Sequence, residues 1–361
     1  MYLLNALPAL KKSGVELEFL CLHPKGKQDG IIDFKKRMEE NGIKCHSIPF
    51  SSFPFISSLR RIHSLIREGN FDLVHSHLIH ADFLLAYYKK ILNPRLKLVS
   101  TKHGYQEWYN NKYGFNPGFK KNNFYLRVAR FAEKQCNASI AISKGLYKLY
   151  TGLNICQEDR LVHIPYGFDF PDDLKEDDRF RFSSQQFVLV GRLTAFKGHR
   201  YALEAIKHLT DEYPELKLLF VGSGPEEESL KSLSEELALD ANVEFLGYSK
   251  EARSYMRNSD IVLVPSVSEG FGVVVLEAFS VSKPIICFDV PSLNEHIEQD
   301  VNGKLVEAYD VQAYAEAIKD LIDHPEKAKS FGLAGYQKLK EFYNLDRMTK
   351  QTLSFYHDLL S

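Results

Sequence analysis

The chain is predicted to be an α/β protein with two domains, each built on a doubly wound parallel sheet. Apolar runs of strand length alternate with segments of helical periodicity along the whole chain, a pattern typical of such sheets. Its 361 residues exceed the number that one hydrophobic core usually supports. With 44% hydrophobic and 26% charged residues, the composition is that of an ordinary globular chain, which excludes a disordered or low-complexity protein.

The N-terminal domain is predicted at residues 1–170, and it is expected to begin with a helix at residues 3–12. Helices are expected between its strands, for which the apolar runs predict the ranges 15–22, 44–49, 73–75, 97–101 and 139–142. Residues 162–165 lead out of this domain. The polar stretch at residues 171–185 is rich in Asp, Lys and Arg and is predicted to be a linker.

The C-terminal domain is predicted at residues 186–344. Three buried strands are expected from its apolar runs, at residues 187–190, 216–221 and 261–264. Two amphipathic helices are expected near the end of the chain, at residues 310–322 and 346–360. Each of the three strands runs into a turn that contains glycine, and ligands of open α/β sheets bind at such strand ends.

The turn from Pro265 to Gly272 follows the third of these strands and carries Glu269. The next residues, Val273 to Val275, are β-branched and favour a strand, but the turn has already ended one strand and better helix formers follow. We therefore predict a helix that begins near Gly272 and holds Glu277 between one and two turns from its start.

The carboxylates of Glu269 and Glu277 are then expected to reach one cleft. Such groups accept hydrogen bonds from adjacent sugar hydroxyls, whereas the free amides at a helix N-terminus bind an anion. The pattern indicates a sugar-nucleotide site. The alternative is an ordinary turn with two solvated glutamates.

Two cations lie on the turn that follows strand 187–190. Arg192 offers a planar set of donors and Lys197 a mobile point charge, a pair suited to neutralising a diphosphate. The alternative is that both are solvated at the surface. The turn after strand 216–221 contains Gly222 and Gly224, which allow a nucleotide to approach the backbone. As a dinucleotide-binding fingerprint it is incomplete, because Glu227 occupies the position of the third glycine.

These segments resemble the retaining glycosyltransferases of family 4, also described as glycosyl transferases group 1. That family has the GT-B fold, in which two Rossmann-like domains face a cleft. The resemblance covers nearly the whole chain, and its order and spacing are specific. The segments that carry it are Gly191–Leu193, Phe196–Gly198, Val221–Pro225, Phe245–Tyr248, Val264–Ser266, Glu269–Glu277 and Asn302–Val306. It also implies that the last helix, at residues 345–361, crosses back onto the N-terminal domain.

The resemblance implies roles for individual residues. Arg192 and Lys197 would hold the donor diphosphate, and Glu269 would hold hydroxyls of the donor sugar. His103 matches the histidine of the family's N-terminal domain and completes the expected catalytic set. Glu277 would bind the ribose hydroxyls. The other residues expected to bind the donor are Phe271, Gly272, Val273, Gly222, Gly224, Gly247, Tyr248 and Ser266.

The implied activity is transfer of a hexosyl unit from a nucleoside diphosphate sugar to a glycan or lipid-linked glycan in cell-surface polysaccharide synthesis, with retention at the anomeric carbon. No metal or other cofactor is expected. A sugar-nucleotide epimerase of the same fold and a non-catalytic sugar-nucleotide-binding subunit are the alternatives. Nucleic acid is not expected as a partner, because no recognition motif accompanies the basic charge.

Three further histidines, His75, His77 and His80, crowd a strand end in the N-terminal half. Alternation along a strand places His75 and His77 on one face. No Cys or acidic pattern nearby completes a metal site. The preferred interpretation is therefore hydrogen bonding at the strand end or contact with the acceptor.

The two halves of the chain differ in charge. Residues 1–170 carry 25 Lys and Arg against 14 Asp and Glu, whereas the rest of the chain carries 21 against 33. Basic and aromatic residues interleave in one segment, at Phe119, Lys120, Lys121, Phe124, Tyr125, Arg127, Arg130, Phe131 and Lys134. This pattern indicates docking on an anionic membrane surface. The alternative is an ordinary amphipathic helix and complementary faces of two domains.

Five widely spaced cysteines, mostly within apolar segments, are typical of the thiols of a reducing compartment. No apolar run reaches the length of a membrane span, and no signal peptide is recognisable. The protein is therefore expected to be cytoplasmic, with peripheral attachment to the inner face of the membrane as an extension of the lipid-docking hypothesis.

Two features depart from the family pattern. The family begins with a strand and a glycine-rich loop, but residues 1–3 of this chain already lie in the helix that follows them. The first N-terminal strand is thus expected to be missing, by truncation or remodelling. Tyr166 stands where many relatives carry Asn.

Overall fold

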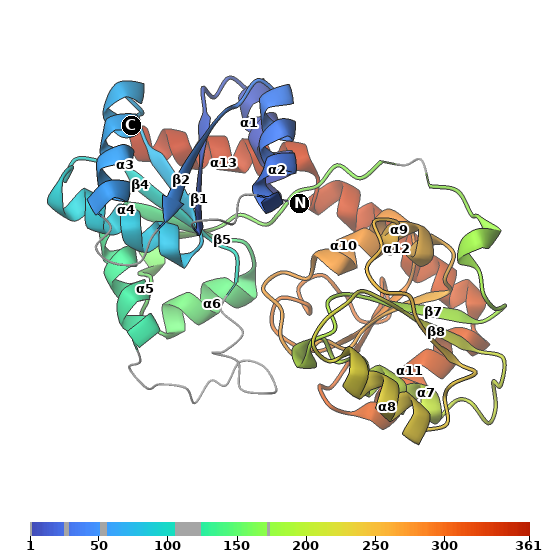
Figure 1. Cartoon of the computed structure of the whole chain (residues 1–361). Coiled ribbons are helices and arrows are strands. Elements are labelled where there is room, and N and C mark those ends of the chain that lie inside the picture. The colour runs from blue at the N-terminus through green and yellow to red at the C-terminus, as the bar shows by residue number, and fades with distance from the viewer. Residues whose placement is uncertain (1, 25–28, 51–55, 105–123, 172–173) are drawn as a thin grey trace. The chain divides into compact units, whose positions relative to one another are not determined.

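The computed structural model describes residues 2–24, 29–50, 56–104, 124–171 and 174–361. The chain forms two compact units. The N-terminal unit contains the described residues up to His103, residues 124–169 and residues 343–361, whereas residue 170 and the described residues from 171 to 342 belong to the C-terminal unit. Both are built from parallel strands and helices (Figure 1), as the sequence predicted.

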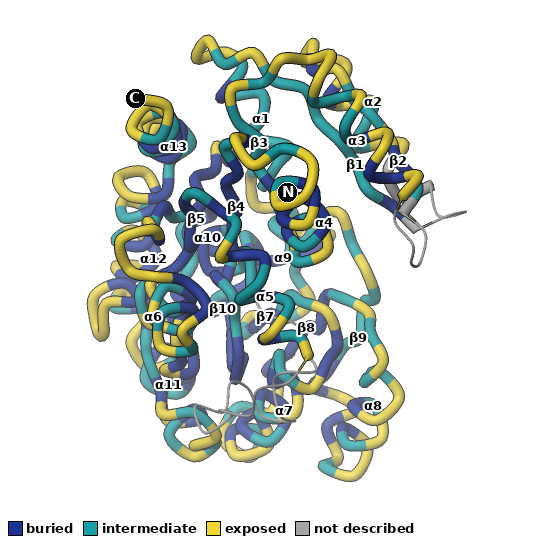
Figure 2. Tube along the Cα trace, turned by 90° about the vertical axis from the view of Figure 1, so that its left-hand side faces the viewer, coloured by how far each residue is buried: buried dark blue, intermediate teal, exposed yellow. Residues whose placement is uncertain are grey.

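The sheet of the N-terminal unit has parallel strands in the order β3-β4-β5-β6. These are β3 (Val74–His77), β4 (Leu98–Lys102), β5 (Ala138–Ala141) and β6 (Leu161–His163). β4 and β5 are buried along their whole length (Figure 2). Two more strands, β1 (Glu18–Pro24) and β2 (Lys44–Phe50), pair in parallel as a separate two-stranded sheet.

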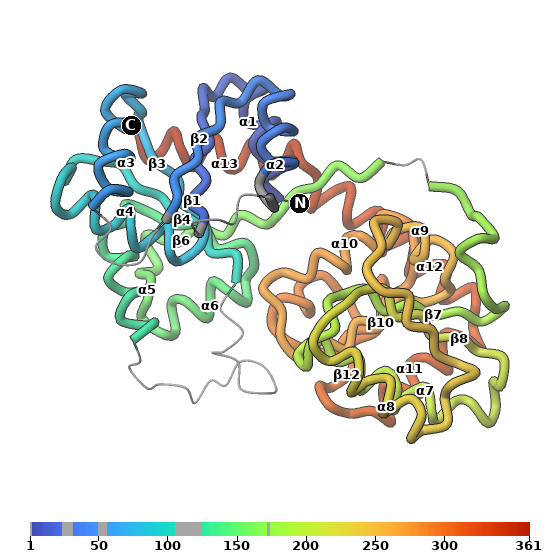
Figure 3. Tube along the Cα trace, viewed as in Figure 1, coloured from blue at the N-terminus to red at the C-terminus, as the bar shows by residue number. Residues whose placement is uncertain are grey.

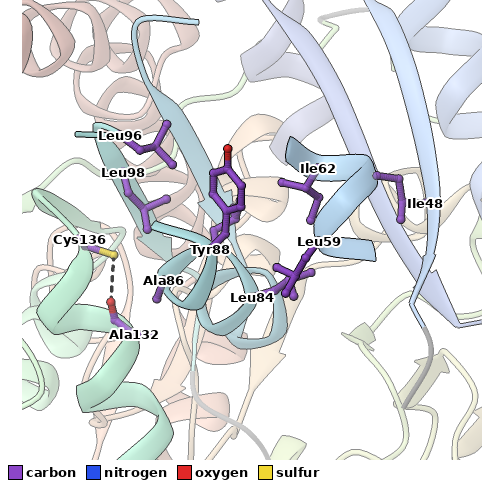
Figure 4. Packing of buried hydrophobic residues seen from close by; sticks show 11 residues of the cluster. Ile48, Leu59, Ile62, Leu84, Ala86, Tyr88, Leu96, Leu98, Ala132 and Cys136 are labelled. Carbon is purple, nitrogen blue, oxygen red and sulfur yellow. Dashed lines mark hydrogen bonds between the residues drawn. The ribbon is translucent and has the colours of Figure 1, made fainter. Parts of the chain in front are cut away.

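The helices of this unit bury their apolar faces in two clusters. They are α1 (Tyr2–Lys12), α2 (Asp29–Glu40), α3 (Ile56–Gly69), α4 (Ile79–Ile91), α5 (Phe124–Gln135), α6 (Lys144–Gly152) and α13 (Leu345–Leu360). In one cluster Ile62 of α3 packs with Leu84 and Tyr88 of α4 and with Leu98 of β4 (Figure 4). This packing encloses one side of the sheet.

The second cluster joins the two ends of the chain. Ala6 of α1 packs with Val99 and Ile140 of the sheet and with Phe355 of α13. Figure 3 shows α1 in blue beside α13 in red, and contacts between the two helices agree. The helix predicted at residues 346–360 is therefore part of the N-terminal core.

The sheet of the C-terminal unit has parallel strands in the order β12-β11-β10-β7-β8-β9. They are β7 (Gln186–Val190), β8 (Lys217–Val221), β9 (Val243–Phe245), β10 (Ile261–Val264), β11 (Ile285–Phe288) and β12 (Lys304–Val306). The α-helices are α7 (His199–Lys207), α8 (Glu227–Glu236), α9 (Ala252–Arg257), α10 (Val273–Ser280), α11 (Val311–Asp323) and α12 (Pro325–Phe342). β10 and β11 are buried throughout, which is typical of parallel sheets with both faces covered.

Element boundaries differ from the sequence predictions by a few residues. The strand predicted from residue 15 begins at Glu18, because the amides of Gly14 and Val15 bond back to carbonyls of α1 and close that helix. The strand predicted at residues 73–75 extends to His77. The helix predicted to begin near Gly272 is confirmed as α10, despite its β-branched start. Among the described residues, no helix is both long and apolar enough to cross a bilayer.

Candidate functional site

Backbone hydrogen bonds join the turns that follow β7 and β8. The amide of Gly191 donates to the carbonyl of Val221 at 3.0 Å, and that of Leu193 donates to the carbonyl of Ser223 at 3.1 Å. A side chain at Gly222 would place its Cβ 1.8 Å from the carbonyl oxygen of Gly191, so only glycine allows this approach. The two turns therefore form one continuous surface at the edge of the sheet.

The turn after β10 is held against the turn after β7 in the same way. The amide of Val267 donates to the carbonyl of Phe196 at 2.9 Å. Gly198 has a φ of +75°, and a Cβ there would lie 1.8 Å from the carbonyl oxygen of Pro265. Because β10, β7 and β8 are neighbours in the sheet, the three glycine turns singled out in the sequence meet at one edge.

Lys197 and Glu269 form an ion pair across these turns. Nζ of Lys197 lies 2.5 Å from Oε1 of Glu269, and the two side chains are only 20% and 10% exposed. Sequence reasoning placed both residues at the site but did not foresee that they pair. The ammonium group is balanced by a carboxylate, which lowers the net positive charge at the turn. Arg192 lies exposed on the same turn.

α10 starts directly after the turn that carries Glu269. Gly272 caps it with a φ of +84°, and a Cβ there would lie 2.5 Å from a methyl carbon of Leu293. Nε2 of the buried His296 donates to the carbonyl of Phe271 at 2.5 Å, and the two rings pack edge to face. The backbone is thus fixed where the helix N-terminus favours an anion.

His296 is itself held by a segment that the resemblance marked. Nδ2 of Asn302 donates to the carbonyl of His296 at 3.1 Å, and its Oδ1 accepts from the amide of Glu298 at 2.7 Å. Sequence reasoning missed His296, because no local motif marks a histidine that acts through contacts with a distant turn. The one indirect indication of His296 was the nearby segment with Asn302 and Gly303, which the resemblance marked.

Glu277 is half-buried on α10. Burial raises the pKa of its carboxyl group from an ordinary value of 4.5 to about 7, although Arg253 and Lys197 act in the opposite direction. The carboxyl group therefore changes its charge near neutral pH. Arg253, on α9, is another neighbour that sequence reasoning missed.

The other residues predicted to bind the donor lie on the same unit. The carbonyl of Gly247 accepts from the amide of Gly222 at 2.8 Å, which joins the turn after β9 to the turn after β8. Gly224 continues the β8 turn, and a Cβ there would lie 2.2 Å from the carbonyl oxygen of Leu193. The ring of Tyr248 is 74% exposed beside Gly247. Ser266 is buried at the end of β10, and Val273 is the first residue of α10.

His103 lies on the N-terminal unit, directly after β4, and both of its ring nitrogens are engaged there. Nε2 lies 2.7 Å from Nδ1 of His77, and Nδ1 bonds with the hydroxyl of Tyr166. Burial lowers the pKa of His103 to about 3, which keeps the imidazole neutral at physiological pH. The structure therefore places this predicted residue in a hydrogen-bonded cluster of its own unit.

The remaining histidines of the cluster have different environments. His75 stacks on His77 at a centroid distance of 4.5 Å, as the alternation of β3 predicted. Both nitrogens of its ring are occupied, by the hydroxyls of Tyr356 and Thr101 at 2.6 and 2.7 Å. His80 is exposed on α4. In the part of the chain that the structure describes, no group of three His, Cys, Asp or Glu side chains is arranged to hold a metal ion.

The C-terminal unit thus gathers three glycine turns, the pair of Lys197 with Glu269 and the start of α10 at the ends of its strands, where open α/β sheets bind ligands. Comparison with known families identifies the class of protein. The model described as Glycosyltransferase Family 4 matches residues 1–170, and the model described as Glycosyl transferases group 1 matches residues 172–338. The chain belongs to the family 4 glycosyltransferases, as its motifs predicted.

Relatives and solved structures support this assignment. An uncharacterized glycosyltransferase of Haemophilus influenzae is 24% identical over 90% of this chain and 86% of its own length. CapM of Staphylococcus aureus, a capsular polysaccharide biosynthesis glycosyltransferase, is 26% identical over 67% of each chain. The structure of Anabaena HepE in complex with UDP matches with a TM-score of 0.77 and 20% identity, over 95% of this chain and 100% of that one. The fold is therefore GT-B.

Proposed function

We propose that this glycosyltransferase moves a hexosyl unit from a nucleoside diphosphate sugar to a hydroxyl of a glycan or lipid-linked glycan, with retention at the anomeric carbon. The observation that carries the proposal is the junction of glycine turns, where Lys197, Glu269 and the start of α10 meet at one sheet edge. UDP in the similar HepE structure supports a nucleotide donor. The relative CapM, by its description, supports a role in polysaccharide synthesis.

The proposed chemistry rests on stabilising the leaving group. As the bond between the anomeric carbon and the diphosphate oxygen breaks, negative charge accumulates on the diphosphate. Arg192, Lys197 and the amides at the start of α10 would stabilise that charge. The acceptor oxygen would bond to the anomeric carbon on the same face, and its proton would pass to the departing phosphate. Glu269 and Glu277 would hold hydroxyls of the sugar and the ribose.

Binding and turnover measurements test this function. A thermal-shift panel of UDP-, GDP- and ADP-sugars identifies the donor, since a ligand stabilises the state that binds it. With that donor, Arg192→Ala and Lys197→Ala are each expected to lower transfer by about 100-fold or more. Lys207→Ala is the matched control, because this cation lies exposed at the far end of α7. Near-normal transfer by the first two variants would contradict the assigned roles.

The same assay separates the two alternatives. An epimerase would convert the donor into an isomer without any acceptor. A non-catalytic subunit would bind the donor but release no nucleoside diphosphate with any acceptor glycan. Transfer of label from the donor to a glycan, with the anomeric configuration retained by NMR, would exclude both.

We further propose that the N-terminal unit docks on anionic lipid, where a lipid-linked acceptor is found. α4 and α5 lie side by side, since the ring of Phe131 contacts the ring of Phe83 at 5.7 Å and Nζ of Lys90 at 5.4 Å. None of their exposed side chains is acidic: His80, Tyr87, Lys90, Ile91, Phe124, Arg127 and Lys134. Phe119, Lys120 and Lys121, which belong to the same sequence pattern, lie outside the described residues.

The acidic residues of these two helices do not reach that surface. α4 and α5 are described in full, and their only acids, Asp82 and Glu133, are both buried. Each pairs with the buried Lys102, at 3.1 and 2.8 Å. The exposed side chains of these helices are therefore basic, aromatic or apolar apart from His80, and none is acidic, a combination that favours the headgroup region of an anionic bilayer.

Sedimentation with vesicles tests the docking. The protein is expected to bind vesicles that contain phosphatidylglycerol, to ignore pure phosphatidylcholine, and to dissociate as salt is raised. The triple variant Lys90→Glu, Arg127→Glu, Lys134→Glu should lose at least about 100-fold in affinity. Lys207→Glu, Lys329→Glu, Lys340→Glu makes the same change in charge on the C-terminal unit and should still bind. Equal loss in both triple variants would show that net charge alone, not this face, drives binding.

A further inference from the structure

A chain of hydrogen bonds in the N-terminal unit ends on His77. The hydroxyl of Tyr166 bonds with Nδ1 of His103, and Nε2 of His103 lies 2.7 Å from Nδ1 of His77. Nε2 of His77 has no hydrogen-bond partner among the residues that the structure describes. His77 is half-buried at the end of β3, so the ring nitrogen that lacks a described partner belongs to His77 and not to His103.

Stacking holds the rings of this hydrogen-bonded series in place. His77 lies between His75 and His103, with centroids 4.5 and 4.9 Å away and small interplanar angles of 23° and 30°. Tyr2 stacks on Tyr166 at 4.4 Å. Close packing on both faces leaves an imidazole little freedom to rotate, so the direction of each ring nitrogen is set.

The surroundings keep all three groups neutral. Burial lowers the pKa of His103 to about 3 and that of His77 well below its ordinary range. Burial also raises the pKa of Tyr166 well above its ordinary value, so the hydroxyl keeps its proton. A neutral imidazole has one N–H group, which means that the position of the proton on one ring dictates its position on the next.

The proton positions on the two imidazole rings depend on whether the hydroxyl of Tyr166 acts as the donor. If the hydroxyl of Tyr166 donates to Nδ1 of His103, the proton of His103 is on Nε2 and is donated to Nδ1 of His77. His77 then carries its own proton on Nε2, the nitrogen without a described partner. In this arrangement the hydroxyl of Tyr166 determines which ring nitrogen of His77 carries the proton. That N–H group lies at the carboxyl end of β3, where open α/β sheets bind ligands.

We propose that His77, rather than His103, donates a hydrogen bond from Nε2 to an oxygen of the sugar substrate. His103 and Tyr166 are positioning residues that keep the proton of His77 on that nitrogen. The inference rests on the proposed function, and it gives Tyr166, a departure from the Asn of many relatives, a physical role.

The tautomers test the inference without any ligand. In protein labelled with ¹⁵N-histidine, two-bond ¹H–¹⁵N correlations should show the Nε2–H tautomer for both His77 and His103. The signals are assigned by their loss in His77→Gln and His103→Asn. In Tyr166→Phe the donor is gone, and the Nδ1–H tautomer should appear in both rings. An Nδ1–H tautomer of His77 in the native protein would overturn the inference, even if the protein proves to be an active glycosyltransferase.

A pair of substitutions at His77 separates substrate contact from a structural role. Asn places its amide near Nδ1 and keeps the bond to His103, whereas Gln places its amide near Nε2 and keeps the donor toward the substrate. With the donor and acceptor identified by the transfer assay, His77→Asn should lower turnover about 100-fold and His77→Gln less than about 10-fold. The reverse order would mean that His77 only supports the fold.

His75 provides the matched control, because its ring belongs to the same stack but both nitrogens are held by Tyr356 and Thr101. His75→Asn and His75→Gln should differ little in turnover. Titration of the labelled protein then identifies the source of the oxygen. A shift of the His77 signal with UDP-sugar but not with UDP assigns the donor sugar, and a shift only with acceptor assigns the acceptor. Absence of any shift during active transfer would overturn the inference.

Discussion

Ionisation of the Glu277 carboxyl group costs free energy in the folded protein, because burial raises its pKa to about 7. In the unfolded chain its pKa is near 4.5, so between these values the folded protein holds a proton that the unfolded chain has lost. The resulting stability is fully present below the unfolded pKa and is lost as the pH rises through about 7.

Glu277→Gln should remove this pH dependence. Between pH 5 and pH 8 the native protein is expected to lose about 2 kcal/mol of stability relative to the variant, because Gln cannot ionise. Thermal unfolding of both proteins at the two pH values measures the difference. Parallel changes in the melting temperature of both proteins would show that another group titrates. For the same reason, if Glu277 binds ribose hydroxyls as an ionised acceptor, donor affinity should increase as the pH rises through about 7.

Lys102 is a buried ionisable residue, and it retains its charge. Burial alone lowers the pKa of its ammonium group, yet Asp82 and Glu133 outweigh this effect and raise the pKa well above its ordinary value. Ser100 also accepts from Nζ at 2.8 Å. The group is therefore a compact ion cluster that ties α4 and α5 to β4.

Lys102→Met should destabilise the N-terminal unit by about 3–5 kcal/mol, because it leaves two buried carboxyl groups without their partner. Chemical denaturation followed by hydrogen exchange in β3–β6 measures the effect on this unit. The triple variant Lys102→Met, Asp82→Leu, Glu133→Leu removes the charges together and should recover most of the loss. Equal instability of both variants would mean that packing, not unpaired charge, is responsible.

The contact between the turns after β7 and β10 depends on one glycine. Gly198 adopts a φ of +75°, and a Cβ there would overlap the carbonyl group of Pro265. Gly198→Ala is expected to separate the two turns and to disturb the pairing of Lys197 with Glu269. Its cost should be at least about 2 kcal/mol, from backbone strain and the clash together. Donor binding, measured by calorimetry, should weaken about 10-fold or more.

Gly152→Ala is the control, since a Cβ at Gly152 would meet open space. Unchanged donor binding in Gly198→Ala would show that the junction does not shape the site.

Most elements with a strong apolar run were predicted from the sequence, although β11, a buried run of four apolar residues, was missed. β7, β8 and β10 are continuous apolar runs ended by glycine or proline, so both their position and their turns were recognisable. β9 and β12 have three residues each, too few to show a period. α12 buries Gly332 and Gly335, which contribute no apolar side chain to a helical stripe.

The residues of the candidate site were predicted better than their contacts. Arg192, Lys197 and Glu269 lie on the turns that follow apolar strands, and Glu277 lies on the helix after one of these turns, so the general rule for parallel sheets locates them. Lys197 pairs with Glu269, Phe271 with His296, and His103 with both His77 and Tyr166. Each partner is remote in sequence, or comes from another strand. Such pairings depend on strand order and register, which no single segment of sequence specifies.

At the scale of the whole molecule, the N-terminal unit is closed by both ends of the chain. α1 and α13 share a core with β4 and β5, and the hydroxyl of Tyr356 on α13 bonds with Nδ1 of His75 at 2.6 Å. The amide of Phe168 also donates to the carbonyl of Tyr343 at 2.8 Å, where the chain returns to this unit. The last helix therefore supports the histidine cluster from a distance of about 280 residues in sequence.

Removal of α13, by ending the chain at Tyr343, should unfold the N-terminal unit selectively. Met348, Phe355 and Tyr356 cover the sheet, and their loss exposes apolar surface of Val99 and Ile140. Hydrogen exchange should become fast in β3–β6 and stay slow in β7–β12, whose core contains none of the deleted residues. If the shortened chain does not express, Met348→Ala with Phe355→Ala should give the same pattern at a cost of about 4–8 kcal/mol. Tyr356→Phe keeps the apolar cover and loses only the bond to His75, so it should leave exchange in β3–β6 nearly unchanged. Uniform loss of protection in both units would show that α13 stabilises the molecule as a whole and not one unit of it.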